Sequence, residues 1–389
     1  MQQALIAPAG DESAGLLDML RDAAGSFARG ELGPNVLRDW RGRQPPFDVN
    51  RWQAMAAMGW TGLLVPEAFG GSDAGLRAAC VVLTELGQAL PPEPVLACGV
   101  LAAVALRDAD PGAVRARLLQ GVAAGDERPA LAHETPSSIQ TAMHAHHEAG
   151  SWVLVGESRF IRPGRGATGW IVRAGTDAGE ALFWLPAGDV PAQALQYEAL
   201  TDGGDAAWLR LQRQTVGESQ LLAEPGRASQ VLRRAADAAL IAIAAELLGV
   251  MRGAFSRALE HLRTRRQFGV AIGSFQSLQH RAVDLHLQHE LTSACVERAA
   301  RRFDEGAQAH ELSLLAAHAK ARASDAALLT SRETTQFHGA MGYTDECDIG
   351  LYFKRSLSLS AWLGNAPQQR QRYAELRFAA AQIEEGSAQ

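Results

Sequence analysis

The sequence predicts an α+β protein of three successive parts: an all-α domain at residues 1–127, a β-domain at 128–226 and a helical bundle at 227–389. Three observations carry this prediction. Apolar residues recur every three to four positions in the first and last parts, as on one face of a helix. The middle part contains short apolar runs between Gly, Asp and Pro clusters, typical of strands in a small antiparallel barrel or sandwich. Long helical segments with short connections predict a four-helix bundle at the C-terminal end.

The composition indicates a globular protein with room for several subdomains. The 389 residues include 43 acidic and 37 basic side chains, with a net charge of −6, and 47% are hydrophobic. A disordered chain is excluded, and without a basic tail we expect no nucleic-acid partner. The longest apolar run, at 94–106, is too short to span a bilayer. Four cysteines without CxxC spacing fit reduced thiols in a cytoplasmic protein and predict no disulfide frame or zinc site.

The individual elements follow from local patterns. Helical spacing is clear at 16–27 and 78–86, and loops are expected at the Pro and Gly clusters that separate these segments. Strands are expected at 152–155, 170–173 and 181–185. The strongest helical pattern covers 228–266, with further helices at 275–304 and 311–336. The alanine-rich centre of the first of these, at 238–245, allows another helix or a flat ligand to approach closely.

Several patterns that resemble functional motifs have a better structural interpretation. Residues Gly164–Gly169 match GxGxxG, but the apolar run that follows reads as a strand, whereas a dinucleotide fingerprint needs a helix there. His144, His146 and His147 lie close together without another type of metal ligand nearby, so a surface strand is the better interpretation and no metal site is predicted. No GxSxG elbow is present, which gives hydrolase chemistry no support.

Three motifs in the C-terminal part each have an ordinary and a functional interpretation. The stretch from Arg265 to His280 predicts a helix ending in a basic cluster, a turn, and a new helix capped by Ser274. Arginine there could pair with a phosphate or be a solvated charge at a helix end. The stretch Gln336–Glu346 ends a helix at glycines, which either admit a cofactor close to the backbone or act as ordinary caps. The third motif, Tyr352–Arg355, begins the final helical segment.

Taken together and in this order, the three motifs resemble the flavin-dependent acyl-CoA dehydrogenase family. The resemblance extends upstream through Gly59–Glu67, Phe69–Gly71, Leu131–Glu134 and Gly150–Phe160, and so covers about 48–377. The amino-acid sequences of 265–280 and 342–346 are most similar to those of the branch that acts on bulky or dicarboxylic acyl-CoAs. Enzymes of that branch are often built from two unlike subunits.

The resemblance implies FAD as cofactor, an acyl-CoA substrate, electron-transfer flavoprotein as electron acceptor, and a homo- or hetero-tetramer. Carried over by motif position, Arg265 would pair with the FAD pyrophosphate, with Phe268 and Gln276 beside it. Gln336 and Gly339 would line the same cofactor from the adjoining chain. Phe160 stands where an aromatic residue packs against the flavin. No membrane partner is implied.

The reaction of this family removes the α-proton of an acyl-CoA while hydride leaves the β-carbon, so a carboxylate must reach that proton. The family places it at one of two positions, and here Ala239 and Gly364 occupy them. The catalytic residue is therefore unassigned. Asp237 and Glu246 are the nearby candidates, although Asp237 points about 200° round the helix and Glu246 lies about 10 Å along it. A structural salt bridge or buried hydrogen bond is the competing interpretation for Glu246.

Further departures from the family pattern concern the flavin and the CoA. Leu240 replaces the arginine that helps to hold CoA, and Arg162 replaces a small hydroxyl residue near the flavin. The loop at 133–138 departs from the usual flavin-contacting sequence, and Ala340 replaces a glycine. Three hypotheses stay open: a dehydrogenase subunit that is self-sufficient or partner-dependent, a non-catalytic scaffold subunit, and a flavin monooxygenase or nitroalkane-type oxidase on the same fold.

Overall fold

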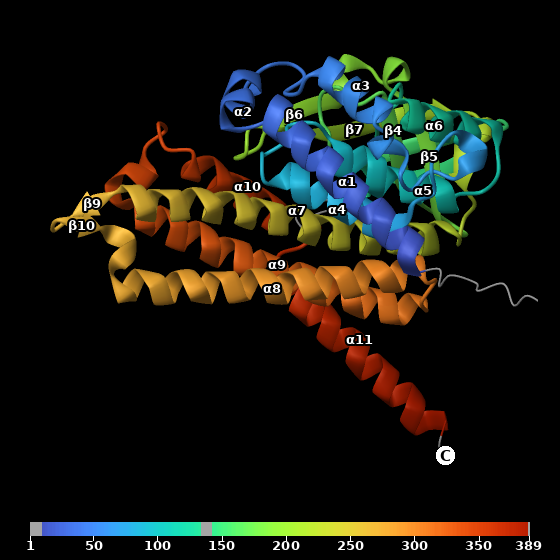
Figure 1. The fold of residues 1–389 in the computed structure, drawn as a ribbon. Coiled ribbons are helices and arrows are strands. Elements are labelled where there is room, and N and C mark those ends of the chain that lie inside the picture. Colours follow the sequence, from blue (N-terminus) through green and yellow to red (C-terminus); the bar gives the residue numbers. More distant parts are fainter. Residues whose placement is uncertain (1–9, 134–141, 388–389) are drawn as a thin grey trace, which may run out of the picture.

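The computed structural model describes residues 10–133 and 142–387, and three layers follow one another along the chain (Figure 1). Six α-helices and a π-helix, η3, in the apolar run at 94–106 form most of the described N-terminal part, together with the 3₁₀ helices η1 (Trp60–Gly62) and η2 (Glu67–Phe69). The α-helices and the π-helix are α1 (Gly10–Glu31), α2 (Pro34–Trp40), α3 (Val49–Ala57), α4 (Gly75–Gly87), η3 (Val95–Ala102), α5 (Ala103–Asp108) and α6 (Ala113–Ala124). The predicted helical segments at 16–27 and 78–86 lie inside α1 and α4, which confirms them.

The middle part is one sheet with the path β6-β7-β3-β2-β4-β5-β8. Its strands are β1 (Pro129–Ala132), β2 (His144–Glu148), β3 (Ser151–Ile161), β4 (Gly169–Thr176), β5 (Gly179–Pro186), β6 (Leu195–Ala199), β7 (Asp205–Val216) and β8 (Leu221–Ala223). The three predicted strands are confirmed, and β4 directly follows the GxGxxG stretch, as the rejection of a dinucleotide fingerprint requires. The expectation of a purely antiparallel sheet needs correction, because β1 pairs with β4 in parallel.

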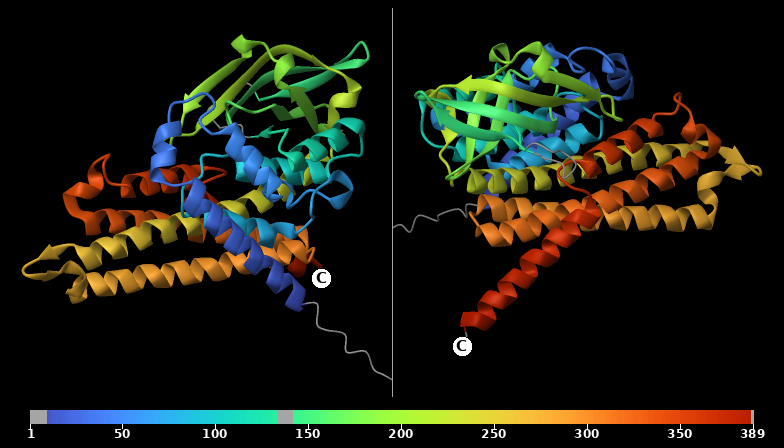
Figure 2. Two further views of the ribbon diagram at one scale, coloured as in Figure 1. Left: turned by 45° about the horizontal axis from the view of Figure 1, so that its top comes forward. Right: turned by 180° about the vertical axis from the view of Figure 1, so that it is seen from behind.

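The C-terminal part consists of α7 (Ala228–Thr264), α8 (Gln276–Asp304), α9 (Ala309–His338) and α10 (Ile349–Ala361), and α11 (Ala366–Ser387) extends away from it (Figures 1 and 2). A short hairpin of β9 (Arg266–Gln267) and β10 (Val270–Ala271) joins α7 to α8 at one end of the bundle. The prediction that Ser274 caps α8 is wrong. Its hydroxyl donates to the carbonyl oxygen of Ala271, 2.7 Å away, inside a 3₁₀ turn, and Phe275 occupies the cap position.

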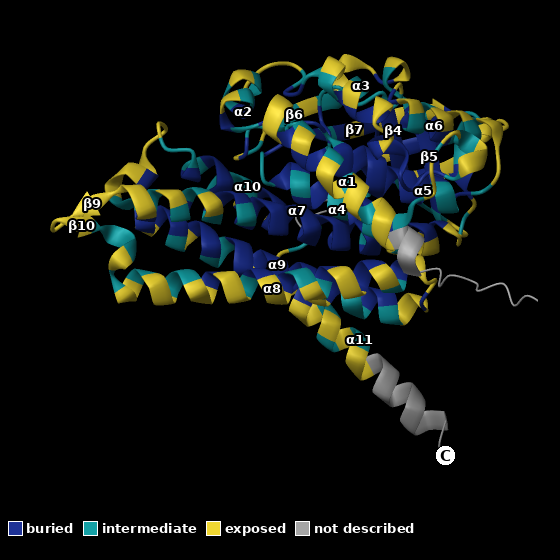
Figure 3. Ribbon diagram, in the orientation of Figure 1, coloured by how far each residue is buried: buried dark blue, intermediate teal, exposed yellow. Residues whose placement is uncertain are grey.

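Helix α7 is the central element of the protein, and most of its length is buried (Figure 3). Two glycines let α4 lie directly on it: a Cβ on Gly249 would stand 2.1 Å from the carbonyl oxygen of Thr84, and a Cβ on Gly87 would stand 2.6 Å from that of Glu246. By length and composition α7 could cross a membrane. However, 89% of its most apolar window is buried inside the protein, which is what a core helix requires.

Candidate functional site

A cavity of about 690 Å³ opens between the β-domain and the bundle. Strand β3 contributes Phe160, the turn just after it contributes Arg162, α7 contributes Leu240, and the turn between α10 and α11 contributes Trp362 and Gly364. The other lining residues are His133, Leu200, Thr201, Ala236, Leu357, Ser358, Ala361, Leu363, Gln368, Gln369 and Arg372. None of these described lining residues is a carboxylate. The size and the largely apolar walls are those of a site for a small molecule.

Arg162 reaches across this cavity from the sheet to the bundle. Its guanidinium carbon lies 4.9 Å from the ring centroid of Trp362, within the range of a cation–π contact. A terminal guanidinium nitrogen of Arg162 donates to the carbonyl oxygen of Ser358 on α10, 3.5 Å away, at the long limit of a hydrogen bond. Phe160, two residues earlier and near the end of β3, is 41% exposed, so its ring is available to a ligand. The cavity is therefore open beside Phe160, whereas the contact between Arg162 and Trp362 spans it from one wall to the other.

A buried charged junction lies behind Arg162 and Trp362, around a second cavity of about 80 Å³ that both residues also line. At its centre, Arg355 of α10 lies 2.9 Å from an oxygen of Asp202 and 3.0 Å from one of Glu246. Burial raises the pKa of Glu246, and Arg355 only partly opposes this. Burial acts on Asp202 as well, but Arg355 and Arg162 outweigh it and hold the pKa of Asp202 below its ordinary value. Since Asp202, Glu246 and Arg355 come from the β-domain, α7 and α10, the junction ties the sheet to the bundle.

The structure places neither candidate base in the large cavity. The carboxylate of Asp237 is buried and accepts hydrogen bonds from Ser313 and Arg372, both at 2.6 Å, so it fastens α7 to α9 and α11. Glu246 lines the small charged cavity and pairs with Arg355, which agrees with the interpretation as a structural salt bridge. Both carboxylates are thus engaged in holding helices together.

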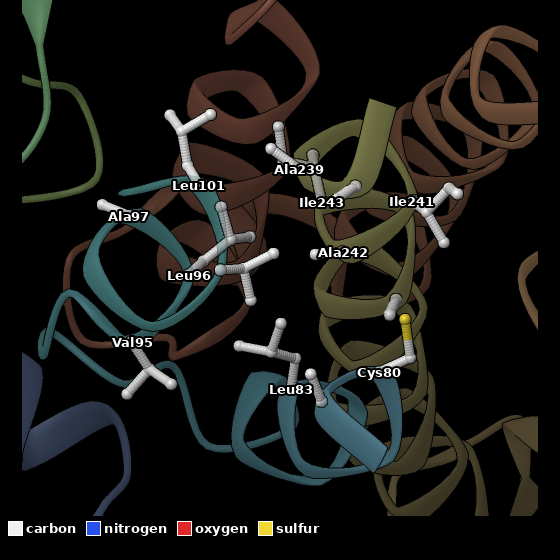
Figure 4. Close-up of a cluster of buried hydrophobic side chains, with 14 of the residues drawn as sticks. Cys80, Leu83, Val95, Leu96, Ala97, Leu101, Ala239, Ile241, Ala242 and Ile243 are labelled. Atoms are coloured by element: carbon white, nitrogen blue, oxygen red, sulfur yellow. The ribbon is translucent and has the colours of Figure 1, made fainter. Parts of the chain in front are cut away.

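The two positions where a base was expected are closed to a carboxylate in this chain. Ala239 has no exposed surface and lies on the face of α7 turned toward Leu96 and Leu101 in the apolar core (Figure 4). Gly364 does line the cavity, but its φ is +95°, and a Cβ there would stand 2.8 Å from the amide nitrogen of Gln369. A side chain at 364 would therefore be strained and would displace a neighbour.

The other predicted cofactor contacts gather at the opposite end of α7. Arg265 caps that helix, Phe268 at the hairpin tip is 92% exposed, and Gln276 begins α8. Gln336 and Gly339 end α9 beside them, because the rings of His261 and His338 stack 4.3 Å apart and join the two helix ends. The five residues, Arg265, Phe268, Gln276, Gln336 and Gly339, therefore share one end of one chain. The assignment of Gln336 and Gly339 to the adjoining chain stays a prediction.

Phe160 does not belong to that group. It lines the cavity with Leu240, and 25 residues of helix, roughly 38 Å at 1.5 Å per residue, separate Leu240 from Arg265. This span is longer than one extended dinucleotide. A ligand on Phe160 and a ligand on Arg265 of the same chain are consequently two different molecules.

Sequence reasoning singled out Arg162 as a departure but missed the residues that hold it. Arg355 was noted only as the start of a helix, and Asp202 was not noted at all. A pair such as Asp202 and Arg355, 153 positions apart, leaves no local spacing that could reveal it. Of the flavin-loop departure, only His133 is described; burial lowers its pKa to about 4, so the ring is neutral at pH 7, and 134–138 lie outside the described residues. Ala340 lies exposed in the turn after α9.

A helical domain, a β-domain and a helical bundle around one small-molecule cavity define the class of protein. The chain belongs to the acyl-CoA dehydrogenase family: the family model for the N-terminal domain matches residues 17–126, and that for the C-terminal domain matches residues 230–376, together well over half of the chain.

Individual relatives span nearly the whole length. Acyl-CoA dehydrogenase IpdE2 of Mycobacterium tuberculosis is 29% identical over 354 residues, covering 90% of this chain and 93% of that protein. A solved variant of the steroid ACAD Tcur3481–Tcur3483 is 28% identical, with a TM-score of 0.81 and coverage of 98% of this chain and 99% of that one. Butyryl-CoA dehydrogenase from Megasphaera elsdenii is 23% identical with a TM-score of 0.83 over 97% of this chain and 100% of that one, a likeness of fold alone.

Members of this family depend on FAD, and the hairpin after α7 and the large cavity differ in how well they suit this cofactor. The hairpin end fits the phosphate-bearing part of the cofactor, because Arg265 is exposed and makes no ion pair with any described carboxylate. The cavity does not fit the flavin ring as it is built, because the contact between Arg162 and Trp362 bridges the space beside Phe160.

Proposed function

We propose that this chain is one subunit of an FAD-dependent acyl-CoA dehydrogenase and that it works with a homologous subunit that supplies the catalytic carboxylate. One observation carries the proposal: the described lining of the cavity contains no carboxylate, while both neighbouring carboxylates, Asp237 and Glu246, are held in buried ion pairs. Abstraction of a proton next to a thioester carbonyl needs a base within hydrogen-bond reach. A partner is then required for the chemistry of this family.

The role proposed for this chain is to bind the phosphate-bearing part of a cofactor whose ring lies in the partner. Arg265 would supply charge-assisted hydrogen bonds to the pyrophosphate, since a guanidinium offers paired donors that match phosphate oxygens. Phe268 and Gln276 would extend the contact along the hairpin, and Gln336 and Gly339 would form its floor. When bound, FAD supplies the hydride acceptor of the reaction, and the residues of this chain only position it.

An exposed apolar stripe on α8 supports assembly into a tetramer. Val283, Leu287 and Leu291 follow one another at four-residue steps and are 57%, 52% and 54% exposed. Such a stripe is costly in water and suits a helix of another subunit. The proposed assembly contains both this chain and the homologous subunit, in keeping with the steroid ACAD Tcur3481–Tcur3483, whose name joins two proteins.

The proposed substrate is an acyl-CoA with a bulky acyl group, and the proposed electron acceptor is electron-transfer flavoprotein, in the cytoplasm. The names of the relatives support the substrate class, since IpdE2 is an acyl-CoA dehydrogenase and the Tcur3481–Tcur3483 protein is a steroid ACAD. A scaffold without chemistry and an oxygen-using flavoenzyme are not favoured, because the curated relatives are dehydrogenases and an acryloyl-CoA reductase.

The test is to purify the chain alone and together with a homologous subunit that has a carboxylate at the position of Gly364 or Ala239. We expect flavin and acyl-CoA-dependent ferrocenium reduction only in the complex. Arg265→Ala is expected to lower the flavin content of the complex. Arg298→Ala, an exposed arginine on α8 away from the hairpin, is the matched control and is expected to leave it unchanged. A complex that reduces ferrocenium equally well with Arg265→Ala would contradict the proposed role of the hairpin.

A further inference from the structure

Arg162 is the residue that makes the cavity unlike a flavin site, and the structure shows what holds it in place. Its guanidinium lies against the ring of Trp362, which follows α10 on the opposite wall. Phe160 lies two positions earlier, near the end of β3, and lines the same cavity. A flat ring packed on Phe160 and inserted toward the bundle would have to pass between Arg162 and Trp362. Entry of the ring would therefore break the contact between these two side chains.

Two buried carboxylates, Asp202 and Glu246, also attract Arg162 to this position. Asp202 and Glu246 are 5% and 4% exposed, and the attraction of Arg162 favours the ionised form of both. Arg355 is the other cation that acts on this pair. If Arg162 swung out of the cavity to make room, two buried carboxylates would keep only Arg355 as a counter-charge. The blocking position is therefore the position that the buried junction stabilises.

We propose that Arg162 excludes the flavin ring from this chain's own cavity, and that the cavity regains ring binding when this one side chain is shortened. The inference rests on the proposed function only for the identity of the cofactor. It goes further in assigning the loss of a flavin site to a single residue and to its contact with Trp362. No step of the reaction is assigned to this cavity.

The experiment titrates the purified chain with FMN and measures flavin fluorescence and equilibrium dialysis. FMN carries the ring and one phosphate without the adenosine part, so its binding reports the ring site independently of the hairpin end. Arg162→Ser opens the space, and we expect it to bind FMN at least tenfold more tightly than the unaltered chain. Arg210→Ser is the matched control, because Arg210 does not line the cavity and its guanidinium carbon lies 4.4 Å from the ring centroid of Trp208 on β7. It is expected to bind FMN as weakly as the unaltered chain.

A second variant separates the effect of the bulk of Arg162 from that of its charge. A third variant keeps the test possible if Arg162→Ser fails to fold. Arg162→Met keeps most of the length without the charge, and we expect it to stay within about threefold of the unaltered chain. If Arg162→Met gains as much FMN affinity as Arg162→Ser, Arg162 still excludes the flavin ring, but through its charge and its contact with Trp362 instead of its bulk. If Arg162→Ser alone melts early, the double variant Arg162→Ser with Glu246→Gln removes one of the two buried carboxylates that would share Arg355, and it is expected to fold and to bind FMN.

Two results would overturn the inference. One is tight FMN binding by the unaltered chain, equal to that of Arg162→Ser. The other is an Arg162→Ser variant that is folded by circular dichroism yet shows no gain. Either result leaves the proposed function standing, because that proposal is judged on the flavin content and ferrocenium reduction of the two-subunit complex. Conversely, an inactive complex would sink the proposed function while a gain of FMN binding in Arg162→Ser could still be observed.

Discussion

Replacement of Arg355 by methionine is the sharpest test of how the parts of the fold are held together. The arginine lies 2.9 Å from Asp202 and 3.0 Å from Glu246, and the three side chains are 13%, 2% and 5% exposed. Methionine fills a similar space but leaves two carboxylates in a low-dielectric site with only Arg162 nearby. Breaking a buried pair by removing one partner costs about 3–5 kcal/mol, and we expect a loss near the lower figure because Glu246 can take up a proton.

The pH dependence of this loss has a definite sign. Without the guanidinium of Arg355, Arg162 opposes burial less than the two arginines do together, so the pKa of Glu246, which burial already raises, moves further above its unfolded value and the pKa of Asp202 rises as well. The folded state then holds protons that the unfolded state releases, so stability falls as the pH rises through the carboxyl range. Urea unfolding of Arg355→Met should therefore show a greater loss at about pH 7 than at about pH 4.5.

A triple variant serves as the matched control. Asp202→Asn, Glu246→Gln and Arg355→Met together remove all three charges at once, and we expect most of the lost stability to return, because uncharged groups of similar size can replace a buried ion cluster at little cost. A loss below about 1 kcal/mol in the single variant, or a triple variant as unstable as the single one, would refute the account of the junction as a buried ion cluster.

Three further predictions concern the helical framework. Gly249→Ala should destabilise the protein by about 3 kcal/mol or more in urea unfolding, because its Cβ would stand 2.1 Å from the carbonyl oxygen of Thr84. Burial lowers the pKa of His289 to about 4, so its share of the stability is lost as the pH falls from its unfolded pKa toward that value. His289→Gln should flatten the acid limb of the stability profile. Asp304→Ala should lower the melting temperature, because its carboxylate accepts from the backbone N–H groups of Leu76 and Arg77 at 2.6 and 2.9 Å and so caps α4 from another helix.

The helical framework was accessible from the sequence because its signal is local. The apolar stripe from Leu240 to Leu262 predicts α7 without any knowledge of its neighbours, and the strand pattern at 170–173 predicts β4 against the competing GxGxxG motif. Two details failed for the same reason. The parallel pairing of β1 with β4 and the turn that uses the Ser274 hydroxyl both depend on what the rest of the chain brings alongside. Neither leaves a periodic trace in the sequence.

For the candidate site, too, the sequence predicted some features and not others. Motif spacing identified Ala239, Gly364 and Arg162 as departures, since each replaces a residue type that the chemistry requires. What the motif could not supply was the consequence of each change: that Ala239 lies in the apolar core and that Arg162 touches Trp362. Those facts depend on which face of a helix meets which strand. Chemical identity was therefore readable from the sequence, whereas accessibility and pairing were not.

The pattern of losses argues for a division of labour between subunits. The cavity lacks a carboxylate in its described lining, carries Leu240 in place of the arginine expected to hold CoA, and is bridged by Arg162. At the far end of α7, roughly 38 Å away, Arg265 and the exposed Phe268 remain available for a cofactor. A chain that had simply lost its function would have no reason to keep an exposed aromatic residue at a hairpin tip, where it is a liability in water. Retention of this end is expected if its ligand lies in another subunit, and the flavin content of the complex with Arg265→Ala measures that dependence directly.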